Sequence, residues 1–105
     1  SLRRLLEQDH DVLAARSGEE ALEFISSNPD IDVILYDVSM PRLTGPEFFE
    51  EVLRINLPIA GRVVFVSGGA TDGDVTRFLA DTSNMVIEKP FDLPYLNDLI
   101  TGMLG

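Results

Sequence analysis

Residues 31–37 read Ile-Asp-Val-Ile-Leu-Tyr-Asp, an apolar run that ends in the carboxylate of Asp37. Short apolar runs bounded by turn residues are typical of strands buried on both faces of a parallel sheet. The residues that follow, 38–45, include Pro41 and Gly45, which indicate a loop. The stretch therefore predicts a buried strand that delivers a carboxylate to the start of a loop.

Two later apolar runs also end at polar residues. Residues 63–66 lead to Ser67, and residues 85–87 are followed by Glu88 and Lys89. In an open α/β sheet, ligands bind in the crevice at the carboxyl ends of the strands. The sequence thus predicts that a carboxylate, a hydroxyl and an ammonium group meet at one edge of the sheet, where they can cradle a phosphoryl group.

The composition narrows the class of protein. The chain has 105 residues, which we expect to form a single domain with one modest core. It has no cysteine and one histidine, His10, so thiolate chemistry and histidine-rich metal sites are excluded. The net charge of −10 argues against nucleic acid or an anionic membrane as a partner. With no apolar run long enough to span a membrane and no signal peptide, we expect a soluble cytoplasmic module.

Helical patterns alternate with the apolar runs. Ser17 and Glu20 form a capping box that opens one helix, which ends before residue 28. Gly45-Pro46 opens another, with Phe48, Phe49, Val52 and Leu53 as its expected core stripe. Further helices are predicted over residues 72–80 and 93–104, part of a helix over residues 2–6, and a short strand over residues 10–14. Strands that alternate with helices predict an α/β fold with a parallel sheet covered on both faces.

The motif Asp37-x-x-Met-Pro-x-x-x-Gly45, followed by Ser67 and then by Lys89-Pro90-Phe91, resembles the receiver domain of two-component response regulators. The spacings also fit that family, and the resemblance covers essentially the whole chain. It implies a flavodoxin-like, doubly wound sheet with strand order 2-1-3-4-5. The segment around Lys89 and the end of the chain after the last helix are also similar to receivers appended to hybrid sensor histidine kinases.

The resemblance implies a role for each matching residue. Asp37 would be the phosphoacceptor, because a carboxylate is a competent nucleophile that gives an aspartyl phosphate. Lys89 would hold one phosphoryl oxygen and Ser67 another. Asp37 and the backbone carbonyl of Ser39 would contact Mg²⁺, an ion that prefers oxygen ligands. Lys89-Pro90 corresponds to a cis peptide in the family, and Gly68-Gly69 would leave space for the donor.

The chain departs from the family pattern in two places. Val86 stands where the switch usually has an aromatic residue, so coupling through a rotating ring is not expected there. The family's first strand and its acidic pair, which help to bind Mg²⁺, are absent. We therefore expect the strand at residues 10–14 to lack its neighbour, the Asp37 strand to have an open edge, and a standard monomer to be unstable. An N-terminally truncated receiver over residues 1–105, a recombinant fragment that starts too late, and an assembly in which another chain fills the gap are the alternatives.

Three functions are compatible with these residues. The first is a phosphorelay receiver that accepts phosphate from a histidine kinase or phosphotransfer protein on Asp37, with at most self-phosphorylation and self-dephosphorylation as activity. It would switch a surface within residues 72–104 that faces a partner protein or an attached output domain. The second is a pseudo-receiver that binds partners without phosphorylation, favoured by the missing acidic pair. The third is a haloacid-dehalogenase-type phosphatase, although Ser39 stands where that chemistry needs a second acid.

Overall fold

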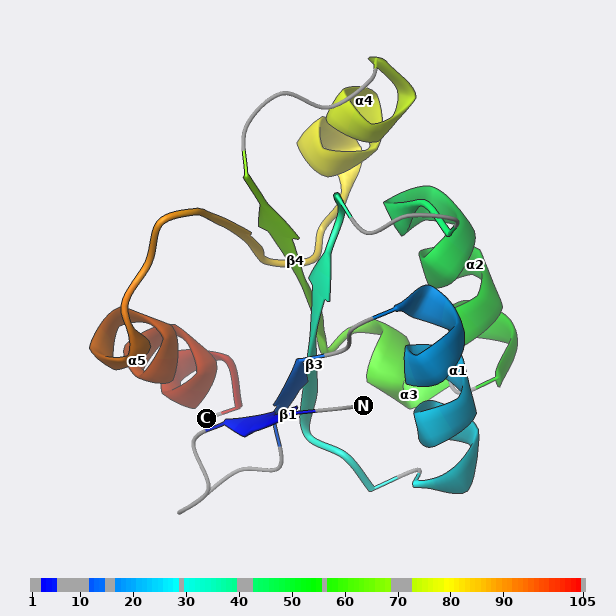
Figure 1. Cartoon of the computed structure of the whole chain (residues 1–105), viewed down its shortest axis with the longest axis horizontal. Coiled ribbons are helices and arrows are strands. Elements are labelled where there is room, and N and C mark those ends of the chain that lie inside the picture. Colours follow the sequence, from blue (N-terminus) through cyan, green and yellow to red (C-terminus); the bar gives the residue numbers. More distant parts are fainter. Residues whose placement is uncertain are drawn as a thin grey trace.

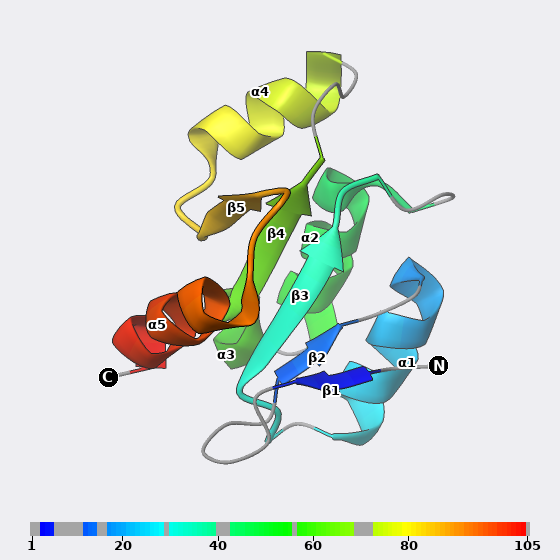
Figure 2. The same cartoon turned by 60° about the vertical axis from the view of Figure 1, so that its left-hand side comes forward.

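A five-stranded sheet forms the centre of the molecule, with its strands in the order in which they occur along the chain. The structure, a computed structural model, describes residues 3–5, 12–14, 17–28, 30–39, 43–55, 57–68 and 73–104. The strands are β1 (Arg3–Leu5), β2 (Val12–Ala14), β3 (Val33–Asp37), β4 (Val63–Ser67) and β5 (Val86–Glu88). Strands β2 to β5 run parallel, whereas β1 is antiparallel to β2. Figures 1 and 2 show β1 and β3 within this sheet, and Figure 2 shows β5 at the edge opposite β1.

The N-terminal edge of the sheet differs from the prediction. Arg3–Leu5 is a strand and not the end of a helix, and it pairs with β2 from Arg3 opposite Ala14 to Leu5 opposite Val12. β2 in turn lies directly beside β3 and pairs with its first three residues, Val33–Leu35, so β2 occupies the place beside the Asp37 strand that was expected to be open. The physical reason is that two helical turns are marginal in isolation, whereas pairing satisfies the backbone groups of β2 and β3. The expected α/β fold class is confirmed, but the strand order around the expected gap is not.

Helices cover both faces of the sheet. They are α1 (Gly18–Ser27), α2 (Gly45–Ile55), α3 (Leu57–Ala60), α4 (Gly73–Asp81) and α5 (Leu93–Leu104). Figure 1 shows α1, α2 and α3 on one side of the sheet and α5 on the other. Residues of α4 join the core on the α1–α3 side, where α4 contacts α2. The arrangement is the expected doubly covered sheet.

Two apolar cores follow from the alternation of side chains along the strands. On the α1–α3 side, Ile34 and Tyr36 of β3 and Phe65 of β4 pack with α1 and α2. On the α5 side, Leu35 of β3 and Val64 of β4 pack with α5 and its neighbours. Consecutive residues of one strand therefore serve opposite cores, which explains why the strand sequences are continuously apolar.

The helix boundaries agree largely with the sequence signals. Ser17 accepts a hydrogen bond from the Glu20 N–H at 3.2 Å, and Asp92 accepts one from the Tyr95 N–H at 2.8 Å. In the predicted stripe of α2, Phe48 and Val52 are buried, and Phe49 packs partly buried against the core. The prediction for Leu53 was wrong, because this side chain is 40% exposed. The sequence signals did not predict the short helix α3.

Candidate functional site

Polar residues gather at the carboxyl ends of β3, β4 and β5. Asp37 is the last residue of β3 and lies opposite Val66, which precedes Ser67 at the end of β4. Ser67 is paired with Glu88 at the end of β5, so Lys89, the next residue, lies at the same edge of the sheet as Ser67. The structure thus brings together the three residues that the sequence placed at one edge.

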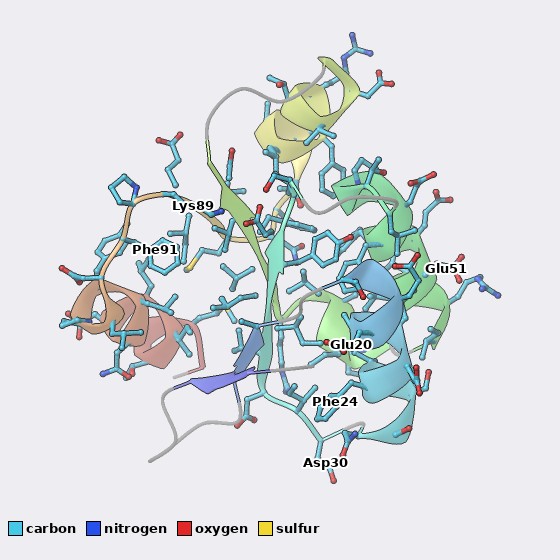
Figure 3. All side chains as sticks on the ribbon, viewed as in Figure 1. Glu20, Phe24, Asp30, Glu51, Lys89 and Phe91 are labelled. Atoms are coloured by element: carbon cyan, nitrogen blue, oxygen red, sulfur yellow. The ribbon has the colours of Figure 1, made fainter. Side chains whose placement is uncertain are left out.

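The Lys89 ammonium group forms an ion pair and hydrogen bond with Oδ2 of Asp37. Figure 3 shows Lys89 on the segment after β5, with its side-chain nitrogen turned toward the sheet. The Lys89 backbone N–H donates to the Ser67 carbonyl at 2.9 Å, which ties the segment to the end of β4. The side chains of Lys89 and Asp37 are 44% and 28% exposed, so solvent and a donor molecule can reach this pair.

Ser39 engages the other oxygen of the same carboxylate. Its backbone N–H and its hydroxyl group donate to Asp37 Oδ1, at 2.9 and 2.6 Å respectively. Sequence reasoning used only the Ser39 carbonyl, as an expected metal ligand, and missed the hydroxyl contact. The available signal was the spacing, because Asp side chains commonly bond to groups two residues further along the chain. Both oxygens of Asp37 are therefore oriented by named donors.

These contacts determine the electrostatics of Asp37. Partial burial acts to raise the pKa of its carboxyl group, but the hydrogen bonds from Lys89 and Ser39 and the Lys89 charge outweigh that effect. The net result is a pKa below the ordinary value of 3.8. Asp37 is therefore an anion at neutral pH, which is the form that can attack an electrophilic phosphorus atom.

The remaining predicted residues take up flanking positions. Ser67 is partly buried at the end of β4. Gly68 follows it and lies close to the Lys89 side chain, because a Cβ atom at position 68 would be 3.4 Å from Lys89 Cδ. The peptide bond between Lys89 and Pro90 is cis, as the motif predicted. Val86 is partly buried and packs against the core on the α1–α3 side. His10 and Gly69 lie outside the described residues.

The donor set does not match a complete magnesium site. Within the part of the chain that the structure describes, no three His, Cys, Asp or Glu side chains lie close enough to hold a metal ion. The four residues after β2, the strand beside Asp37, are Ala15, Arg16, Ser17 and Gly18, and none carries a carboxylate. Among the described residues, the two expected ligands, Asp37 and the Ser39 carbonyl, would therefore form only part of a magnesium site.

Comparison with known proteins identifies the family. Residues 1–101 match the response regulator receiver domain. The chain belongs to this family. It is 30% identical over 99 residues to a chemotaxis protein CheY homolog from Campylobacter jejuni, in an alignment that covers 90% of this chain and 73% of the homolog. The receiver family generally binds Mg²⁺ and acts in two-component systems, and this assignment disfavours the phosphatase hypothesis.

A larger relative places such a receiver within a sensor kinase. The sensor kinase CckA from Brucella abortus is 33% identical over 104 residues, which are 98% of this chain but 11% of CckA. This chain therefore spans about a tenth of that relative. A crystal structure of a signal receiver domain from Vibrio parahaemolyticus superposes with a TM-score of 0.70 at 18% identity, covering 93% of this chain and 73% of that one. The flavodoxin-like fold class is thus confirmed. None of the helices in the described residues has the length and apolar character to cross a membrane.

Proposed function

We propose that this receiver domain accepts a phosphoryl group on Asp37 from a histidine kinase or a phosphotransfer protein. The observation that carries the proposal is the pairing of the Asp37 carboxylate with the Lys89 ammonium group at the carboxyl edge of the sheet. The ammonium group stabilises the anionic nucleophile and lies where negative charge would arrive with a phosphoryl group. The domain boundaries, residues 1–105 as one receiver, belong to the same proposal.

The proposed reaction is a displacement at phosphorus. An oxygen of Asp37 forms the new O–P bond while the bond from phosphorus to the donor, a P–N bond in phosphohistidine, breaks. The electron pair of the broken bond leaves with the donor nitrogen, which recovers a proton from solvent. Lys89 neutralises the phosphoryl oxygens as a compact charge, and the Ser67 hydroxyl donates to another oxygen. Asp37 is held for this step by the two Ser39 donors.

The consequence of phosphorylation would be a change in the surface formed by α4, β5 and α5. A phosphoryl group shifts this surface only if it binds one conformation better than the other. Val86 is aliphatic, so the signal would pass through movement of the segments that carry Ser67 and Lys89, which are tied by the Lys89 N–H to Ser67 carbonyl bond. The downstream partner would be another protein or an output domain, and similarity to CckA favours a larger sensor kinase as the parent protein.

The second candidate is a pseudo-receiver, an interaction module that is not phosphorylated. The observation that favours it is the incomplete metal donor set among the described residues. In that case the Asp37–Lys89 pair would only stabilise the fold, and partner binding would not depend on a phosphoryl donor. The two candidates therefore differ in whether Asp37 reacts at all.

The deciding experiment is intact-mass spectrometry after incubation with acetyl phosphate or phosphoramidate, each in Mg²⁺ and in EDTA. We expect the gain of one phosphoryl group, lost in Asp37→Asn and retained in Asp98→Asn, which changes an exposed aspartate on α5 in the same way. Equal uptake by Asp37→Asn would overturn the assignment of the phosphoacceptor. No uptake by the wild-type protein under any of these conditions would favour the pseudo-receiver.

A further inference from the structure

Tyr36 immediately precedes Asp37, and its side chain packs in the core on the α1–α3 side of the sheet. Its side chain is fully buried, and its ring stacks on Phe48 with centroids 3.9 Å apart and planes 12° apart. Phe65 packs against it edge-on at 6.4 Å. At its polar end, the Tyr36 hydroxyl donates to the Leu43 carbonyl at 2.5 Å. A buried tyrosine thus links β3 to the far end of the loop that follows Asp37.

The space around the hydroxyl group is closed by α1. A Cβ atom at Gly18, the first residue of α1, would lie 2.8 Å from the Tyr36 hydroxyl oxygen and 2.6 Å from Leu43 Cδ2. Real Cβ contacts are essentially never this short, so a residue larger than glycine at position 18 would displace Leu43 or the Tyr36 hydroxyl group. The start of α1 therefore packs directly against the Tyr36–Leu43 contact, while Phe48 of α2 stacks on the Tyr36 ring.

The residues on either side of this contact are themselves fixed. After Leu43, Thr44 and Glu47 form a reciprocal capping box at the start of α2, with distances of 2.9 and 3.2 Å. Before it, the Val38 N–H donates to the Val66 carbonyl at 2.9 Å, directly after Asp37. Ser39, which holds Asp37 Oδ1, follows Val38 and lies four residues before Leu43 in the chain.

The hydroxyl group is a dependable donor. Burial, together with the negative charges of Glu19, Glu47 and Asp37, raises the pKa of Tyr36 well above its ordinary value. The Tyr36 hydroxyl group therefore keeps its proton throughout the physiological pH range. A phenylalanine in its place would keep the stacked ring and lose only this bond.

We propose that Tyr36 is a positioning residue for phosphoryl transfer, because its bond ties Leu43 to β3, and Ser39, which orients the Asp37 carboxylate, lies in the chain between these two anchors. The inference rests on the proposed function, because it concerns the same carboxylate. Tyr36 does not contact the phosphoryl group and acts through Leu43 and Ser39. Small displacements of a nucleophile slow a reaction strongly, since the reacting atoms must be within a narrow range of distances and angles.

The test compares Tyr36→Phe with Asn84→Ala. Asn84 is a matched control because its side-chain amide also holds main-chain carbonyls, those of Ala60 and Val63 at 2.7 and 2.8 Å, but at the amino end of β4. Two readouts are measured for each variant at a temperature at which both are folded. They are the rate of phosphorylation by phosphoramidate and the hydrogen-exchange rate of the Ser39 amide by NMR. The exchange readout does not require phosphorylation.

We expect Tyr36→Phe to slow phosphorylation by roughly tenfold and to accelerate exchange at Ser39, with no such change in Asn84→Ala. Ser39→Ala removes the hydroxyl contact to Asp37 and keeps the backbone N–H contact, so in this background Tyr36→Phe should have a smaller effect on the rate than in the wild type. Equal rates and equal Ser39 exchange in Tyr36→Phe and wild type would overturn the inference, as would full additivity with Ser39→Ala. A wild-type protein that takes up no phosphoryl group would instead overturn the proposed function, and the inference with it.

Discussion

Two adjoining regions of this receiver domain meet at the carboxyl end of β3 and differ in polarity and exposure. The first, the carboxyl rim, is polar and partly exposed, and the second, the aromatic cluster, is apolar and packed. The carboxyl rim consists of Asp37, Ser39, Ser67 and Lys89, and the aromatic cluster of Tyr36, Phe48, Phe49, Phe65 and Phe78. They meet at Tyr36 and Asp37, where exposure changes from 0% for Tyr36 to 28% for the Asp37 side chain. We therefore propose that stability and reactivity are assigned to consecutive residues.

The largest effect on stability should come from the aromatic cluster. Phe65 is fully buried and meets the rings of Tyr36, Phe49 and Phe78 at 6.4, 6.0 and 5.1 Å. Phe65→Ala should lower the free energy of unfolding by about 3–5 kcal/mol, because it leaves a cavity among packed rings. Urea denaturation measures this loss. If the variant does not fold, Phe65→Leu should cost less than about 1.5 kcal/mol; a loss below about 1 kcal/mol for Phe65→Ala would contradict the comparison.

A substitution in the carboxyl rim should have the reverse effect, with a large loss of phosphorylation rate and a small loss of stability. Lys89→Met keeps an apolar stem and removes the charge, so phosphorylation by phosphoramidate should slow by roughly 100-fold. The same variant should lose less than about 1 kcal/mol of stability, because the Lys89 side chain is exposed to solvent. Rates are compared with those of Arg77→Met, which removes an exposed cation on α4. An unchanged rate in Lys89→Met would show that the ion pair has no part in the reaction.

The amino end of β4 offers a way to lose stability without losing activity. The two hydrogen bonds from Asn84 to the carbonyls of Ala60 and Val63 are partly shielded from solvent. Asn84→Ala should lower the free energy of unfolding by about 1–3 kcal/mol, because those carbonyls lose their donor. Phosphorylation per folded molecule should be unchanged. A rate as slow as that of Lys89→Met would show that the amino end of β4 and the carboxyl rim are not separable.

The smallest expected effect is the dependence of stability on pH at Asp37. Its pKa is lower in the folded protein than the ordinary value of 3.8, so the ionised form stabilises the fold. This contribution is complete above the unfolded pKa and is lost as the pH falls below 3.8 and through the folded pKa. The difference in stability between wild type and Asp37→Asn, expected to be less than about 1 kcal/mol at neutral pH, should therefore disappear on acidification. Denaturation curves from neutral to acidic pH test this, and a difference that grows on acidification would contradict it.

The sequence predicted the carboxyl rim better than the edges of the sheet. Asp37, Ser67 and Lys89 each follow an apolar run, and parallel pairing brings such positions together without further information. The helix predicted over residues 2–6 was wrong, because pairing of Arg3–Leu5 with the free edge of β2 outweighed the helical spacing. Leu53 fits a helical stripe by spacing, but its exposure depends on what α2 faces.

The side-chain contacts that orient Asp37 could be predicted only in part. The hydroxyl group of Ser39 is close in sequence to Asp37, so its contact follows from local geometry. The sequence predicted Tyr36 only as part of an apolar run. Its hydrogen bond to Leu43 depends on how α1 and α2 pack against its ring, which the sequence pattern does not show. A tertiary contact of this kind leaves no periodic signal.

The central claim is that Asp37 is the residue that reacts. An acyl phosphate can be reduced by borohydride to an alcohol, which converts a phosphorylated aspartate into homoserine. The most direct measurement is therefore peptide mass spectrometry of the phosphoramidate-treated, borohydride-reduced protein. The account predicts homoserine at position 37 in the wild-type protein and none in Asp37→Asn. Homoserine at another aspartate, or none in a protein shown to carry the phosphoryl group, would contradict it.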